Sequence, residues 1–156
     1  MHTLNHSQDD LNKISDMQDV EQMASKIREI LNKEVEEIGN SKRCFIGGFS
    51  SGGWLAAYVW KTYEKPLAGL IAYSIATLKS LAVNKAQEES GVFWAHGIED
   101  WMMQYKHGVY NNYALKDGKR KFVHVAREGL GHGVDTVVEV ETKHFMEEVR
   151  SIKPKL

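Results

Sequence analysis

Apolar residues recur every three or four positions in the first part of the chain, which is the period of one face of a helix. They are Val20, Met23, Ile27, Ile30, Leu31, Val35 and Ile38. Ser15 followed by Gln18 resembles a capping box, and Gly39 and Asn40 tolerate the left-handed backbone that ends helices. The pattern therefore predicts an amphipathic helix that starts near Ser15 and stops at Gly39.

Beyond this helix, short apolar runs alternate with segments of helical character. The runs at residues 43–47, 67–74, 91–97 and 119–129 predict strands, and residues 51–64, 78–89, 103–115 and 138–152 predict helices. Strands that are apolar throughout are typical of a parallel sheet covered by helices on both faces. We therefore predict an α/β fold with a mostly parallel sheet of about four strands, formed by residues 15–156 after a polar segment, 1–14.

Composition limits the partners and the cellular compartment that can be expected for this domain. Hydrophobic residues make up 42% of the 156, enough for a core, and the net charge of −1 gives no reason to expect nucleic acid as a partner. The only cysteine, Cys44, lies in an apolar run and cannot form an internal disulfide, which fits a reducing compartment. No apolar run reaches the roughly 18 residues of a transmembrane segment. These features favour a cytoplasmic protein.

One short motif brings in chemistry. Gly48-Phe49-Ser50-Ser51-Gly52 matches G-x-S-x-G at the junction between a predicted strand and a predicted helix. On such a sharp turn the hydroxyl of Ser50 projects above the sheet, flanking glycines avoid clashes, and the N–H of Ser51 is available to an oxyanion. The alternative is an ordinary glycine-rich turn. The register selects Ser50 as the nucleophile because Ser51 would need a glycine in place of Phe49.

A serine nucleophile needs a base and an acid, which follow in the order serine, acid, histidine in this class of site. Asp100 lies just past the third predicted strand, and His132 lies in a glycine-rich loop after the fourth. Both positions are at the carboxyl edge of the predicted sheet, close to Ser50. Glu99 is a rival acid, and Asp100 could instead cap the helix that follows it.

The remaining histidines carry weaker signals. His96 starts the Asp100 loop and suggests a structural role, and His124 alternates with valines inside a strand. The others lack partners at ligand spacing, so no metal site is predicted: His2, His6, His107 and His144.

Taken together, the stretches GGFSSGG, HGIED and EGLGH resemble successive motifs of the acyl-protein thioesterase and carboxylesterase family of α/β-hydrolases. The resemblance implies a partial α/β-hydrolase fold with Ser50, Asp100 and His132 as the catalytic triad and Ser51 in the oxyanion hole. It also implies hydrolysis of fatty-acid esters and thioesters, including acyl groups on protein cysteines and lysophospholipids, without a cofactor. In the acid loop, Ile98 and Trp101 stand where the family usually has aspartate and proline.

The family also begins with further strands and a glycine-containing loop that donates one N–H of the oxyanion hole, and the resemblance starts downstream of them. We therefore expect the strand at residues 43–47 to be an exposed edge that attracts a partner. That partner could be another copy, a separately encoded first half or a larger assembly, unless the chain is a fragment. The leading hypothesis is a serine hydrolase. The alternative is a catalytically weak or inactive structural subunit derived from one.

Overall fold

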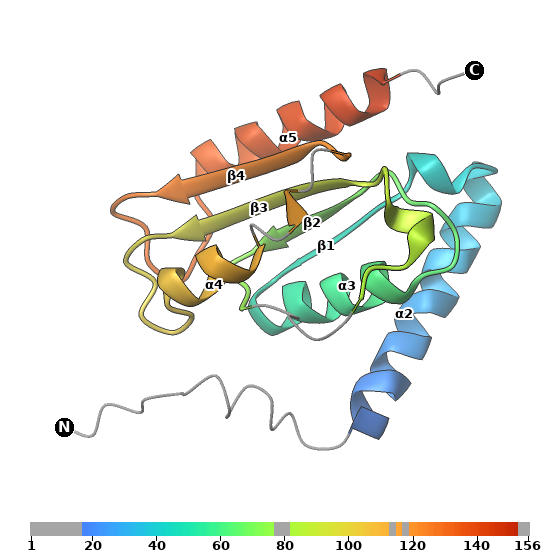
Figure 1. Cartoon of the computed structure of the whole chain (residues 1–156), viewed down its shortest axis with the longest axis horizontal. Helices are drawn as coiled ribbons and strands as arrows, with labels where there is room; N and C mark the ends of the chain where they lie inside the picture. The colour runs from blue at the N-terminus through green and yellow to red at the C-terminus, as the bar shows by residue number, and fades with distance from the viewer. Residues whose placement is uncertain (1–16, 77–81, 113–114, 117–118, 153–156) are drawn as a thin grey trace.

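The computed structural model describes residues 17–76, 82–112, 115–116 and 119–152 (Figure 1). In chain order its elements are α2 (Met17–Ile38), η1 (Ser41–Arg43), β1 (Phe45–Phe49), α3 (Ser50–Thr62), β2 (Gly69–Tyr73), η2 (Lys85–Gln87), β3 (Gly91–Gly97), α4 (Tyr105–Asn112), β4 (Phe122–Arg127) and α5 (Thr136–Ser151). Segment 1–14 and Ser15 lie outside the described residues, so their predicted roles stay predictions. No helix in the described ranges is long and apolar enough to cross a membrane.

The four strands form one parallel sheet in the order β1-β2-β3-β4, as the alternation of apolar runs predicts. Strand β3 lies in the middle and all seven of its residues are buried. Strand β1 is an edge in the described part of the chain, where it pairs with β2 alone. It starts two residues later than predicted because Asn40 caps the 3-10 turn η1, in which its side chain accepts from the N–H of Lys42.

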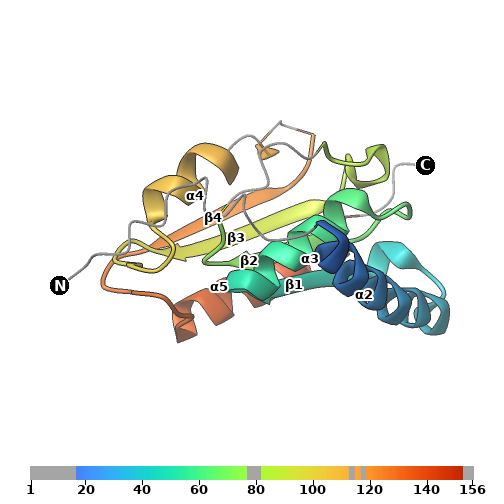
Figure 2. The ribbon, with the colours of Figure 1, turned by 90° about the horizontal axis from the view of Figure 1, so that it is seen from below.

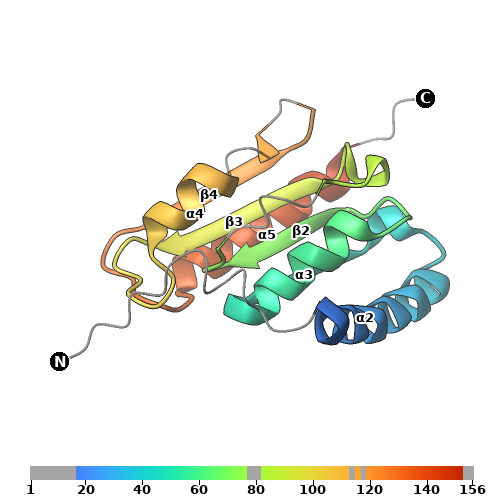
Figure 3. The same ribbon diagram turned by 60° about the horizontal axis from the view of Figure 1, so that its bottom comes forward.

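Helices cover both faces of this sheet. Helices α3 and α4 pack on the face that presents Leu70, Ala72, Val92 and Trp94, and α5 packs on the face that presents Ile71, Phe93 and Ala95. Figure 2 shows α4 and α5 on opposite sides of the strands, and Figure 3 shows α3 in front of them with α5 behind. The prediction of a sheet enclosed on two sides is confirmed.

Helix α2 lies in a second layer, against α3 rather than on the sheet (Figure 1). It buries Val20, Leu31 and Val35 from the predicted stripe, together with Ala24, whereas Met23 and Ile30 stay about half exposed or more, at 48% and 61%. Gly39 ends the helix with a φ of 73°, as expected of a left-handed cap. The apolar period therefore identified the helix but overestimated the width of its buried face.

The helix predicted at residues 78–89 is wrong in its described part, where only the one-turn helix η2 is present. Residues 77–81 lie outside the described ranges. Gln87 explains the short turn, because its fully buried amide accepts from the N–H of Leu67 and donates to the carbonyls of Tyr63 and Lys65. These bonds tie the segment to the turn between α3 and β2, which a continued helix would not do.

Candidate active site

Ser50 occupies the bend between β1 and α3. Phe49 is the last residue of the strand, and Ser50 is the first of the helix with a φ of 54°. A positive φ is costly for a residue with a Cβ, and such strain concentrates at functional sites. The sharp strand-to-helix turn inferred from the motif is therefore present. Ser51 lies in the first turn of α3, whose N–H groups have no acceptor within the helix.

The glycines around this bend differ in how tightly they are packed. A Cβ on Gly48 would lie 2.6 Å from the backbone of Gly52, and a Cβ on Gly53 would lie 2.6 Å from the carbonyl oxygen of Gly48. At Gly52 itself, an added Cβ would meet nothing within 4 Å in the described structure. The close approach of strand and helix thus depends on Gly48 and Gly53, one position later than the motif suggests. Gly52 is adjacent to the tight contact without being required for it.

The structure brings the three predicted site residues into one hydrogen-bonded chain. His132 Nε2 lies 3.0 Å from Ser50 Oγ, and His132 Nδ1 lies 2.8 Å from Asp100 Oδ2. The three side chains come from the segments that follow β1, β3 and β4, all at the carboxyl edge of the sheet: Ser50 is the first residue of α3, and the other two lie in loops. The Phe49 ring packs on the imidazole of His132 at 4.7 Å between centroids. The imidazole can therefore exchange a proton with the serine while the carboxylate holds its other nitrogen.

Asp100 uses both carboxylate oxygens and thereby makes the contacts of both predicted roles. Oδ1 accepts from the backbone N–H groups of Met102 and Met103 at 3.0 and 2.8 Å, as a turn cap does. Oδ2 remains for His132. The side chain is buried, whereas the rival acid Glu99 is exposed. Because the turn at Met102 and Met103 is closed by Asp100, helix α4 begins at Tyr105 instead of residue 103.

A fourth residue, His96, also contacts the acid. Its Nε2 lies 3.3 Å from Asp100 Oδ2 and 2.6 Å from the carbonyl oxygen of Met103. Burial holds the pKa of His96 below its usual range, against the opposing effects of the Met103 carbonyl and the Asp100 carboxylate. His96 is a residue of β3, inside the strand predicted at 91–97, although the sequence also suggests it as the start of the Asp100 loop. The spacing of four residues to Asp100 was the available signal.

The surroundings of the site are apolar and partly open. Exposed large side chains flank all three residues along the chain: Phe49 beside Ser50, Ile98, Trp101 and Met102 around Asp100, and Val134 near His132. Trp101 is the most exposed of them at 77%. Surface Trp and Met side chains in one region are typical of contact with apolar ligands or partners.

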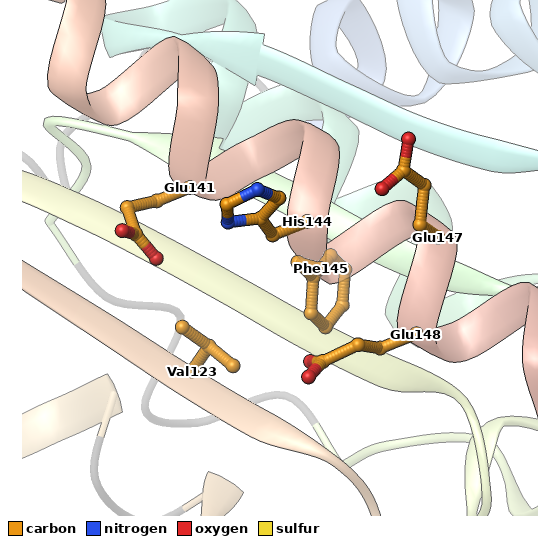
Figure 4. Close-up of a pocket in the computed structure, with 6 residues that line it drawn as sticks. All are labelled: Val123, Glu141, His144, Phe145, Glu147 and Glu148. Carbon is orange, nitrogen blue, oxygen red and sulfur yellow. The ribbon is translucent and has the colours of Figure 1, made fainter.

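The described residues include no group of three or more histidine, cysteine, aspartate or glutamate side chains that could hold a metal ion. A cavity of about 260 Å³ does lie between β4 and α5 (Figure 4). Its lining does not include Ser50, His132 or Asp100. The lining residues are Val123, Glu141, His144, Phe145, Glu147 and Glu148. The hydrogen-bonded chain of Ser50, His132 and Asp100 is therefore separate from this cavity, at the carboxyl edge of the sheet.

Known proteins are similar to this chain in sequence. The chain is 33% identical to acyl-protein thioesterase 1 of Neurospora crassa over 110 residues, which are 67% of this chain and 45% of the relative. It is 28% identical to carboxylesterase SOBER1 of Arabidopsis thaliana over 112 residues, 69% of this chain and 49% of the relative. The chain thus spans about half the length of these curated relatives.

Solved structures show the same fold. The crystal structure of Arabidopsis thaliana SOBER1 superposes with a TM-score of 0.77 at 23% identity, over 87% of this chain and 67% of that one. The Bacillus cereus carboxylesterase superposes with a TM-score of 0.71 at 17% identity, over 86% and 63%. A family model described as phospholipase/carboxylesterase matches residues 5–149. The chain therefore belongs to the phospholipase/carboxylesterase family of α/β-hydrolases.

Proposed function

We propose that this chain is a serine hydrolase that cleaves carboxylic ester or thioester bonds of acyl substrates through Ser50, His132 and Asp100. The observation that carries the proposal is the hydrogen-bonded chain from Ser50 Oγ through His132 to Asp100. It occurs at a strained strand-to-helix bend, in a chain related to a thioesterase and a carboxylesterase. Nucleophile, base and orienting acid are the parts that acyl transfer requires.

In the proposed mechanism, Ser50 Oγ attacks the acyl carbonyl carbon while His132 Nε2 takes the hydroxyl proton. The resulting oxyanion accepts a hydrogen bond from the N–H of Ser51 and lies at the positive end of α3. His132 then gives its proton to the leaving alcohol or thiol as the tetrahedral intermediate collapses to an acyl-enzyme. Water, deprotonated by His132, releases the free acid and restores Ser50. Asp100 stabilises the imidazolium in both steps without taking its proton.

The surroundings of the site and the names of the relatives support a substrate class for this proposal. We infer fatty acyl esters and thioesters, among which acylated protein cysteines and lysophospholipids are the candidates. The exposed apolar side chains near the site, such as Trp101 and Met102, can contact a hydrocarbon chain. The relatives include proteins named as acyl-protein thioesterase and as carboxylesterase. No cofactor is needed, because every proton in the mechanism moves between the serine, the imidazole, water and the leaving group.

We also propose that a further strand-bearing protein segment pairs with the edge of β1 and supplies a second oxyanion N–H. Phe49 is partly exposed at this edge, and Gly47 is exposed. Within the described ranges the outer edge of β1 has no strand beside it, and such an edge is a template for strand addition. One oxyanion donor typically contributes about 2.7 to 4 kcal/mol of transition-state stabilisation. Hydrogen exchange of the β1 amides tests the pairing, since protection that is already complete in the isolated monomer would contradict it.

The central test is labelling with a fluorophosphonate, which reacts only with an activated serine. We expect stoichiometric reaction at Ser50 between pH 6 and 9 and its loss in Ser50→Ala. Ser51→Ala is the matched control, because it removes a neighbouring hydroxyl but keeps the backbone N–H and should still react. No labelling of the wild-type chain at any pH in that range, or equal labelling of Ser50→Ala, would exclude the proposed nucleophile and favour a non-catalytic role.

A further inference from the structure

His96 is enclosed beneath the active site. Its side chain has no exposed surface, and its ring packs edge-on against Trp94 at 5.8 Å and Tyr105 at 5.7 Å between centroids. Helix α4 closes over it at Gly108, where an added Cβ would lie 3.2 Å from His96 Nδ1. A buried polar side chain at such a place needs a reason, because removing an imidazole from water is unfavourable unless its nitrogens find partners.

The two ring nitrogens of His96 have different surroundings, and these fix the position of its proton. Nε2 faces two acceptors, the Met103 carbonyl oxygen at 2.6 Å and Asp100 Oδ2 at 3.3 Å. Nδ1 has no hydrogen-bond partner among the described residues. A neutral imidazole carries one N–H, and only at Nε2 does that N–H find an acceptor. A proton on Nδ1 would leave Nε2 as a lone pair facing two oxygens.

The bond from His96 to Met103 closes a loop of interactions around Asp100. His96 Nε2–H donates to the carbonyl oxygen of Met103, and the backbone N–H of Met103 donates to Asp100 Oδ1 at 2.8 Å. Asp100 Oδ2 then lies between His96 and His132. The Asp100 carboxylate is therefore held by the backbone N–H groups of the turn at Oδ1 and by His96 of β3 at Oδ2. Its direction toward His132 depends on both.

We propose that His96 is a positioning residue for the hydrolytic site, which through its Nε2–H holds the turn at Met103 and aims the Asp100 carboxylate at His132. The inference rests on the proposed function, because aiming matters only if His132 acts as a base. Small errors in the placement of a catalytic group are enough to slow a reaction about 10- to 100-fold. Binding of the acyl substrate involves other residues, so the effect falls on kcat and not on KM.

Two substitutions of similar size separate the role of Nε2 from that of a space-filling ring. In His96→Gln the side-chain amide reaches the position of Nε2 and can donate to the Met103 carbonyl. In His96→Asn the shorter amide reaches only the position of Nδ1. We expect kcat for a short-chain acyl ester to fall about 10- to 100-fold in His96→Asn with KM nearly unchanged. His96→Gln should restore most of it.

A second measurement does not depend on activity. In ¹⁵N-histidine-labelled protein, the wild type should show a low-field proton resonance from His132 Nδ1–H bonded to Asp100, and ¹⁵N shifts should report His96 protonated at Nε2. The His132 resonance, assigned by its loss in His132→Gln, should disappear by exchange in His96→Asn and persist in His96→Gln. Ser74→Gly is the matched control. Ser74 is fully buried, comes directly after the neighbouring strand β2, and has a φ of 51°, which glycine adopts freely.

The outcomes separate the two proposals. If His96→Asn keeps the His132 resonance, or the wild type carries the His96 proton on Nδ1, the positioning role is overturned even if Ser50 reacts with a fluorophosphonate. Loss of the resonance in Ser74→Gly as well would also overturn it, since any change in the buried layer would then suffice. If the resonance behaves as expected but Ser50 does not react, the proposed function fails while the contact network stands.

Discussion

Replacing Asp100 with asparagine tests how the acid controls the imidazole. Asparagine has nearly the same shape as aspartate, so the hydrogen-bond partners around residue 100 determine which way its amide group is oriented. With its oxygen in the place of Oδ1, the amide still accepts from the N–H groups of Met102 and Met103. Its NH₂ then faces His132 Nδ1, which must become an acceptor. The proton of His132 moves to Nε2, where it points at Ser50 and cannot accept the serine proton.

The opposite orientation is also disfavoured, which allows the loss to be estimated. Turning the amide over breaks the two backbone hydrogen bonds, worth about 1 kcal/mol each, and places a donor against two buried N–H groups at a further cost of about 1 to 3 kcal/mol. Loss of the carboxylate charge beside the imidazolium adds about 1 kcal/mol. The sum of about 4 to 6 kcal/mol corresponds to a fall in kcat of about 10³-fold to slightly more than 10⁴-fold.

The assay is hydrolysis of a short-chain chromogenic acyl ester, with the thermal midpoint recorded for each variant. We expect Asp100→Asn to fold nearly as stably as the wild type, since the bonds of the turn remain. Glu99→Gln is the matched control: it is adjacent and exposed, and its activity should equal that of the wild type. Asp100→Asn with more than a tenth of the wild-type kcat, or a comparable loss in Glu99→Gln, would refute the reasoning.

Two further predictions concern stability. Gly48→Ala should lower the free energy of unfolding by at least about 1 to 3 kcal/mol, because the added methyl group would meet the helix backbone at 2.6 Å. Gly52→Ala should raise the free energy of unfolding by about 0.5 to 1 kcal/mol, because it lies at an open helical position. If urea denaturation gives both changes the same sign, the packing described is contradicted. His124, whose pKa burial lowers from 6.5 to about 4, stays neutral in the native state while the unfolded chain takes a proton, so stability falls as the pH drops from 6.5 toward 4. His124→Phe keeps an aromatic ring against Trp94. After allowance for partial exposure, it should remove about 1 to 2 kcal/mol of the free energy of unfolding that the wild type loses between pH 7 and 5. An unchanged pH dependence of urea unfolding in this variant would show the explanation to be wrong.

Local chemistry in the sequence was sufficient for much of the fold and for the candidate residues. Strand β3 matches its prediction in full, because a buried central strand is apolar over most of its length, here with His96 as the exception, and glycines bound it. The bend at Ser50 was predictable from the same kind of local signal, since a strand that turns sharply into a helix needs glycine where the backbones meet. The positions of Asp100 and His132 followed from chain order at the carboxyl edge of a parallel sheet.

Other features depend on contacts between segments far apart in the chain, which no local pattern contains. Glycine is required at position 53 and not at position 52, because a Cβ at 53 would meet the carbonyl oxygen of Gly48. Only the packed helix shows which of the two positions faces Gly48. Ile30 belongs to the same apolar stripe as Leu31, yet it is exposed because α2 packs on α3 along a narrow line. The sequence thus determined which residues could form the hydrogen-bonded chain. Only the tertiary structure decided that His96, a strand residue, would join it, because β3 and the turn after it must fold together before His96 can contact Met103 and Asp100.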